Sequence, residues 1–108
     1  MEAAQIRQKL SQLDQIIHRA AQAVREDQRA SQELKTCVQE LGTQAKEAQE
    51  SLTEGEEQTT LIECVDEMEE TSDRAKKACE ASKGLSQQAK SAVMQAHQQL
   101  SDLKHQLH

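Results

Sequence analysis

The sequence contains no proline, phenylalanine, tyrosine or tryptophan and only three glycines among its 108 residues. The large β-forming side chains are therefore missing, and so is the residue that most strongly breaks helices. Most of the chain consists of Ala, Gln, Glu, Lys, Leu and Ser, most of which are good helix formers. The composition predicts an all-α fold. With 35% apolar residues, the chain can fill a narrow seam between helices but not a thick globular core.

Targeting and membrane signals are also missing. No apolar run approaches the roughly 20 residues that span a bilayer, and residues 1–5 lack a charged-then-apolar signal pattern. The three cysteines, Cys37, Cys64 and Cys79, are odd in number and have no CxxC spacing, which favours reduced thiols. These features predict a cytoplasmic protein that does not contact a membrane.

Motifs of enzymes and of nucleic-acid-binding proteins are absent as well. There is no Gly-rich phosphate loop, nucleophile elbow or HExxH sequence. The acidic excess and the lack of aromatic stacking residues argue against nucleic acid. Asp14 and His18 are one helical turn apart and His97 is expected to face them, but scattered solvated histidines are favoured over a zinc site. We therefore expect no enzyme, cofactor, metal or small-molecule substrate.

Apolar residues recur with a strict 4-3 spacing, which is the pattern of a coiled-coil seam. The first series is Ile6, Leu10, Leu13, Ile17, Ala20, Val24, Asp27, Ser31, Leu34, Val38, Leu41, Ala45, Ala48 and Leu52. The second is Leu61, Val65, Met68, Ser72, Ala75, Cys79, Ser82, Ser86, Ala89, Val93, Ala96, Leu100, Leu103 and Leu107. Each series predicts one long helix.

The spacing fails once, between Leu52 and Leu61, and Gly55 in this gap suits a helix C-cap. The sequence therefore predicts a single domain that is a long antiparallel two-helix coiled-coil hairpin, with helix 1 over about 3–53, a turn over about 54–59 and helix 2 over about 60–107. The residue numbers of facing seam positions then sum to 113. Gly42 and Gly84 keep the phase and are interpreted as tolerated. The structural alternative is a three-helix bundle with a break near one of them.

Four of the polar seam positions fall together midway along this hairpin: Asp27, Ser31, Ser82 and Ser86. One interpretation is a polar layer that fixes the register, because a misaligned pairing would leave Asp27 desolvated against an apolar residue. The other, which we favour, is a hydrated weak spot in a thin bundle.

Apolar residues also flank the seam on one side, at Ile16, Ala23, Ala30, Cys37, Cys64, Ala78, Leu85 and Ala92. This flank makes the apolar stripe wider than two helices require, so we expect a protein interface there. The simplest partner is a second copy, giving a homodimeric four-helix bundle.

Charge is divided unevenly along the chain. Between Glu47 and Asp73 there are eleven acidic residues and no Lys or Arg, whereas the rest of the chain carries 13 basic and eight acidic residues. The acidic tip comprises Glu54, Glu56, Glu57, Glu63, Asp66, Glu67, Glu69, Glu70 and Asp73. It could lie near the basic open end of a second copy, or dock a basic protein surface, or only be solvated.

The sequence thus favours a non-enzymatic protein–protein interaction module, an adaptor or assembly scaffold acting through the apolar flank and the acidic tip. A small helical chaperone for a basic or helical client is the alternative within the binding class. From another class, surface histidines or cysteines could serve a metal- or redox-responsive sensor.

Overall fold

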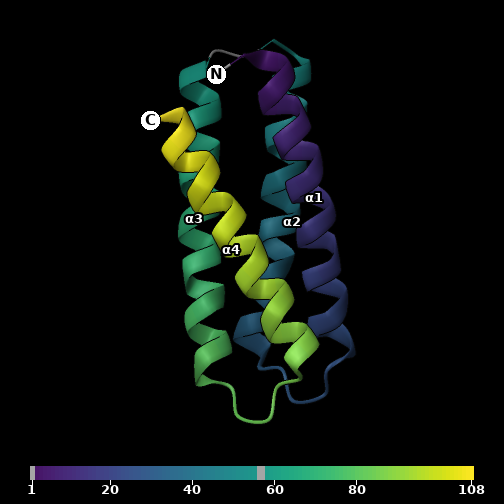
Figure 1. Cartoon of the computed structure of the whole chain (residues 1–108). Helices are drawn as coiled ribbons and strands as arrows, with labels where there is room; N and C mark the ends of the chain where they lie inside the picture. The colour runs from purple at the N-terminus through teal and green to yellow at the C-terminus, as the bar shows by residue number, and fades with distance from the viewer. Residues whose placement is uncertain (1, 56–57) are drawn as a thin grey trace.

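The chain folds into a bundle of antiparallel helices. The structure, a computed structural model, describes residues 2–55 and 58–108, and these form four helices: α1 (Ala3–Glu26), α2 (Gln32–Thr53), α3 (Gln58–Ala81) and α4 (Gln87–Leu107) (Figure 1). Each helix packs against two others, in the pairs α1–α2, α2–α3, α3–α4 and α1–α4. The bundle measures 42 × 20 × 18 Å, and no strand occurs in the described ranges. The all-α prediction is confirmed.

The two long helices of the predicted hairpin are each broken in the middle. Helix 3–53 is interrupted at residues 27–31, and helix 60–107 at residues 82–86. The side chains of Ser31 and Ser86 cap the following helices, because each hydroxyl accepts a hydrogen bond at 3.1 Å from the backbone N–H three residues on. The long hairpin is wrong for this structure, and so is the three-helix alternative, because both of these loops are breaks.

The two loops lie next to each other at one end of the bundle, whereas both termini and the α2–α3 turn lie at the other end (Figure 1). Gly84 adopts a φ of +79°, and a Cβ at this position would clash with the side chain of Arg29 in the neighbouring loop. Gly84 is therefore required by a turn, and its interpretation as a tolerated helical residue is wrong.

The seam residues form the core. Every seam residue within the four helices, Ser72 included, is buried except Leu52, which is half-buried. Asp27, Ser31, Ser82 and Ser86 lie in the loops between the helices. The largest fully buried apolar side chains include Leu10, Ile17, Leu34, Leu41, Met68 and Leu100. The 4-3 pattern thus identified the buried face of each helix correctly.

The α2–α3 turn agrees with the predicted C-cap. The N–H of Gly55 donates to the carbonyl of Leu52 at 3.2 Å, and Gly55 has a φ of +77°. Among the described helices, none is long and apolar enough to cross a membrane.

Asp27 joins the two loops. Its Oδ2 accepts a hydrogen bond from the backbone N–H of Ser86 at 2.7 Å, and its Oδ1 accepts one from the N–H of Arg29 at 2.9 Å. The hydrogen bond from the Ser86 amide, which has the largest effect, and that from the Arg29 amide hold the pKa of Asp27 below its ordinary value. The ionised carboxylate is therefore the form that holds the loops together.

We expect Asp27→Asn to lower the melting temperature at neutral pH, because a neutral amide oxygen accepts these hydrogen bonds less strongly. A depressed carboxyl pKa contributes stability that is present above the unfolded pKa of about 4 and is lost as the pH falls through the folded pKa. The melting temperatures of the two proteins should therefore converge in acid. A difference that is independent of pH would contradict this role for the charge.

Candidate protein-binding groove

Of the four residues of the predicted register layer, Asp27 and Ser86 meet, at a junction between loops and not in a layer inside a long hairpin. Asp27 meets Ser86 at 2.7 Å, as the sum of 113 requires. The Ser82 hydroxyl donates to the carbonyl of Ala78 at 2.8 Å, and Ser31 caps α2. None of the four residues is buried, because they stand where the chain reverses at the solvent-exposed end of the bundle.

The predicted interface flank is largely covered within one chain. Ala30, Cys37, Ala78 and Leu85 are buried, and Ile16, Ala23, Cys64 and Ala92 are half-buried against the same core. In a single long hairpin these side chains would be bare, but here α2 and α3 fold back beside α1 and α4. The apolar flank therefore exposes less surface for a dimer than the sequence indicated. Homodimerisation itself stays a prediction.

Part of the acidic tip faces basic groups of the same chain. The carboxylate of Glu69 lies 3.6 Å from the Lys104 ammonium, and that of Asp66 lies 2.9 Å from Nε2 of His108. Glu54, Glu63, Glu67 and Glu70 are exposed, and Asp73 lies 3.3 Å from Lys77 on its own helix. Glu56 and Glu57 lie outside the described residues. Acidic residues of this tip thus lie near the basic open end of their own chain, whereas the expectation placed them near that of a second copy.

The residues of the sensor hypothesis are dispersed. Asp14 and His18 line a groove beside α2, whereas Nδ1 of His97 lies 3.0 Å from the Ser72 hydroxyl on α3, so His97 does not face them as expected. Burial raises the pKa of the thiols of Cys37, Cys64 and Cys79. A smaller thiolate fraction makes these thiols poor nucleophiles at neutral pH.

The largest hollow described on the surface is a groove of about 740 Å³ between α1 and α2. Its floor is apolar and is formed by Ile17, Ala21 and Val38, together with the bare backbone at Gly42. At one end, Nε2 of Gln49 donates to the carbonyl of Leu10 at 3.4 Å and bridges the two helices. The lining residues span 14–25 on α1 and 32–49 on α2, about 17 to 26 Å of helix, enough for roughly three to five turns of a third helix.

Gly42 keeps this groove open. A Cβ built at Gly42 would meet no atom within 4 Å, and its φ is not positive, so neither close packing nor a turn within the chain requires glycine there. A glycine in a helix interior costs about 1 kcal/mol relative to alanine. The absence of a side chain at this point leaves room for a partner's backbone or large side chain.

The rim of the groove is mainly basic. Arg25, Lys35 and Lys46 line it, against the single carboxylate of Asp14. The rest of the chain carries most of the acidic residues, so this face differs in sign from the molecule, whose net charge is −6. An apolar floor with a cationic rim suits an apolar ligand surface with carboxylates at its edges.

Comparisons with known proteins give no match to any family model, curated protein or solved structure.

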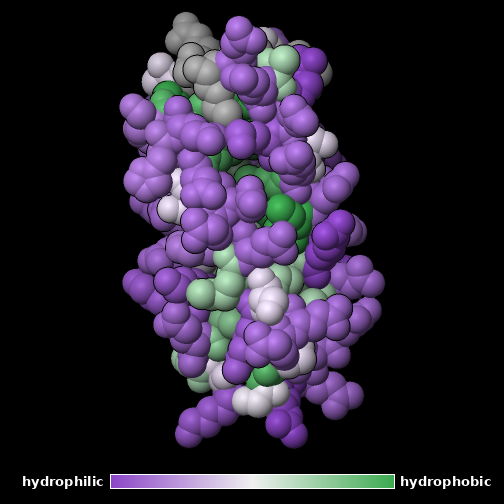
Figure 2. All heavy atoms as spheres, viewed as in Figure 1, coloured by the Kyte–Doolittle hydropathy of each residue, from purple (hydrophilic) through white to green (hydrophobic). Residues whose placement is uncertain are grey.

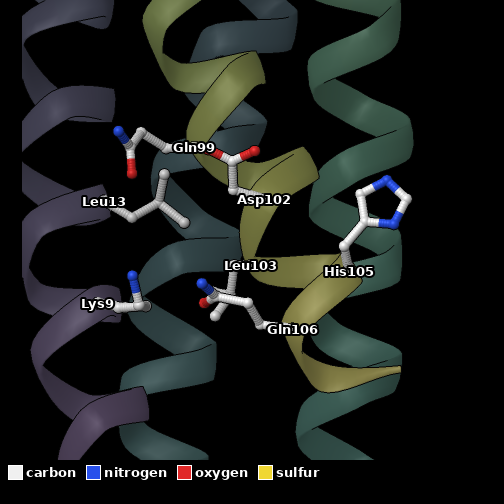
Figure 3. A pocket seen from close by; sticks show the side chains of 7 residues that line it. All are labelled: Lys9, Leu13, Gln99, Asp102, Leu103, His105 and Gln106. Carbon is white, nitrogen blue, oxygen red and sulfur yellow. The ribbon is translucent and has the colours of Figure 1, made fainter.

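A second, smaller hollow of about 310 Å³ lies between α1 and α4. Leu13 and Lys9 of α1 face Leu103 and Gln106 of α4 there, while the ring of His105 points away from α1 (Figure 3). On the same side of the molecule, an apolar strip shows between hydrophilic side chains where α4 meets its neighbours (Figure 2). This hollow has less than half the volume of the groove between α1 and α2, so that groove is the stronger candidate.

Sequence reasoning did not identify this groove. Its residues lie on the side of the seam opposite the apolar flank, and in a long hairpin α1 and α2 would be one continuous helix with no groove between them. Gly42, interrupting an otherwise helical sequence, was the one available signal.

Proposed function

We propose that this protein is a non-enzymatic helix-binding module whose groove between α1 and α2 takes an amphipathic helix with acidic edges. The observation that carries the proposal is the groove at Gly42, a mid-helix glycine whose missing side chain nothing in the described chain replaces. The bound helix would place a large apolar side chain over Gly42 and its carboxylates near Arg25, Lys35 and Lys46. Recognition of this kind is the helix-in-groove mode of peptide binding.

Such a module would act as an adaptor or assembly scaffold, because binding is the only chemistry that the groove supports. The lining holds an apolar floor, cations, amides, Asp14, His18 and Thr43, and the Thr43 hydroxyl donates to the carbonyl of Gln39 at 3.3 Å rather than to a base. The specificity of the module would come from the charge of the rim, and the affinity from the apolar floor.

The test uses two synthetic 18-residue amphipathic helical peptides with leucines on one face. One has glutamates along both edges, and the matched peptide has lysines at the same places. We expect the glutamate peptide to bind at least about tenfold more tightly at low salt, with the preference falling as salt is raised. Amide chemical shifts should change along α1 and α2 and not along α3.

Two substitutions at one position supply the control. Gly42→Leu places a large side chain in the groove, at a point where its Cβ would meet no atom within 4 Å, and should reduce peptide affinity at least about tenfold, while keeping the helix intact. Gly42→Ala adds one methyl group and should retain most of the binding while raising the free energy of unfolding by about 0.5–1 kcal/mol. Equal binding of the two peptides, or unchanged binding by Gly42→Leu, would remove this function.

A further inference from the structure

The 4-3 spacing of the seam continues without interruption through both of the loops that close this bundle. Positions 24, 27, 31 and 34 follow the 4-3 spacing through the first loop, and positions 79, 82, 86 and 89 follow it through the second. A five-residue loop does not need to preserve this spacing. If both loops became helical, α1 with α2 and α3 with α4 would join as two continuous helices whose apolar faces stay aligned.

The loops are also placed to open together. Both lie at the same end of the bundle, and the hydrogen bond from the N–H of Ser86 to Asp27 joins them (Figure 1). The pairs α1–α4 and α2–α3 lie on opposite sides of this double hinge along the chain. Opening it would separate the chain into two halves, each of which keeps one interhelical contact and exposes an apolar face.

We propose that two copies of this chain exchange these halves and form a dimer of long hairpins. In each end of such a dimer, α1 and α4 of one copy would pack against α2 and α3 of the other. The same core positions would be filled as in the closed monomer, so every seam residue in the helices would keep its environment. The partner that fits the exposed halves is therefore a second copy.

The contacts that would pass between chains are already complementary in the closed form. They include the Gln49 bond to the Leu10 carbonyl across α1 and α2, and the Ser72–His97 and Glu69–Lys104 contacts across α3 and α4. The contacts that would stay within each chain include the ion pair of Arg74 with Glu40 at 3.1 Å between α2 and α3. No new side-chain complementarity is needed, which is the usual reason for exchange at low cost.

The balance between the two forms is set by the loops. The closed form gains the caps at Ser31 and Ser86 and the bonds of Asp27, which a continuous helix would lose. In the open form Gly84 would lie in a helix interior, where glycine is destabilising. The closed monomer is thus favoured in dilute solution, and the exchanged dimer at high concentration.

The test measures mass and length after refolding at millimolar concentration. Light scattering should find a dimer, and its X-ray scattering should give a maximum dimension of roughly 75–80 Å, because a continuous helix over 3–53 is about 75 Å long. The closed bundle measures 42 Å along its longest axis.

Gly84→Ala should raise the dimerisation constant roughly 30-fold, since each of two chains replaces a glycine at positive φ by a helix former. Ser31→Ala, which removes a cap and adds an apolar seam residue, should act in the same direction if Gly84→Ala does not fold. Gln28→Pro should abolish the dimer, because proline cannot continue the helix through the hinge.

Each outcome decides the matter. A dimer that persists in Gln28→Pro, or that is no longer than the closed bundle, would show an ordinary surface contact and overturn the exchange. The exchange would also be overturned if the wild type, Gly84→Ala and Ser31→Ala were monomeric at all concentrations.

Discussion

Replacing Leu100 with alanine is expected to lower the free energy of unfolding by roughly 2–5 kcal/mol. Leu100 on α4 is fully buried, and the core contains no aromatic side chain, so few large residues fill it. The cavity left by a leucine would be lined by residues on packed helices, which can collapse into it only in part. Because small domains have total stabilities of about 5–15 kcal/mol, the loss is a large share.

Urea denaturation followed by circular dichroism measures this change, and Met94→Ala supplies the control on the same helix. Met94 is 39% exposed, so its truncation should change the free energy of unfolding by no more than about 0.5 kcal/mol. Equal losses for the two variants would mean that α4 does not present the seam to the core.

A pair of matched proline substitutions should have very different effects. Gln15 and Gln28 are both exposed glutamines, but Gln15 lies within α1 and Gln28 lies in the first loop. Proline at Gln15 removes a helical hydrogen bond and clashes with the preceding turn, which costs about 3 kcal/mol or more.

Proline at Gln28 should change the free energy of unfolding by less than about 1 kcal/mol. Gln28 follows Asp27, whose φ of −90° and ψ of 111° suit a residue before proline. It is also the second residue of a turn closed by the bond from the Ala30 N–H to the Asp27 carbonyl, a position that proline favours. Thermal and urea denaturation of both variants measure the effect, and a loss at Gln28 as large as at Gln15 would show that the loop is helical.

The sequence predicted the buried face of each helix and the pairing of α1 with α4 and of α2 with α3. These follow from the 4-3 spacing and from the phase jump at Leu52, because apolar periodicity reports which side of a helix faces the core. The bond between Asp27 and Ser86 has the predicted sum of 113. Such pairing is the same in a long hairpin and in a closed bundle.

The loops at 27–31 and 82–86 were not predicted, because the 4-3 spacing of the seam continues through them as it would through a helix. Asp27, Ser31, Ser82 and Ser86 occupy seam positions, so they read as a polar layer, although serine after a short polar run is also a helix N-cap signal. Gly84 has a positive φ and lies against Arg29, whereas Gly42 lies inside α2 with no neighbour at its Cβ position, and the sequence reveals neither difference. The groove between α1 and α2 could not be predicted once these helices were taken as one.

The central claim is that α1 folds back on α2 within a single chain. Nitroxide labels carried by unnatural amino acids at Gln12 and Glu47, two exposed positions close to the Gln49–Leu10 contact, would report it by pulsed electron spin resonance on the monomeric fraction. In a bundle 20 × 18 Å across, we expect a label separation under about 30 Å. A separation near 50 Å, the length of 35 residues of continuous helix, would contradict the account.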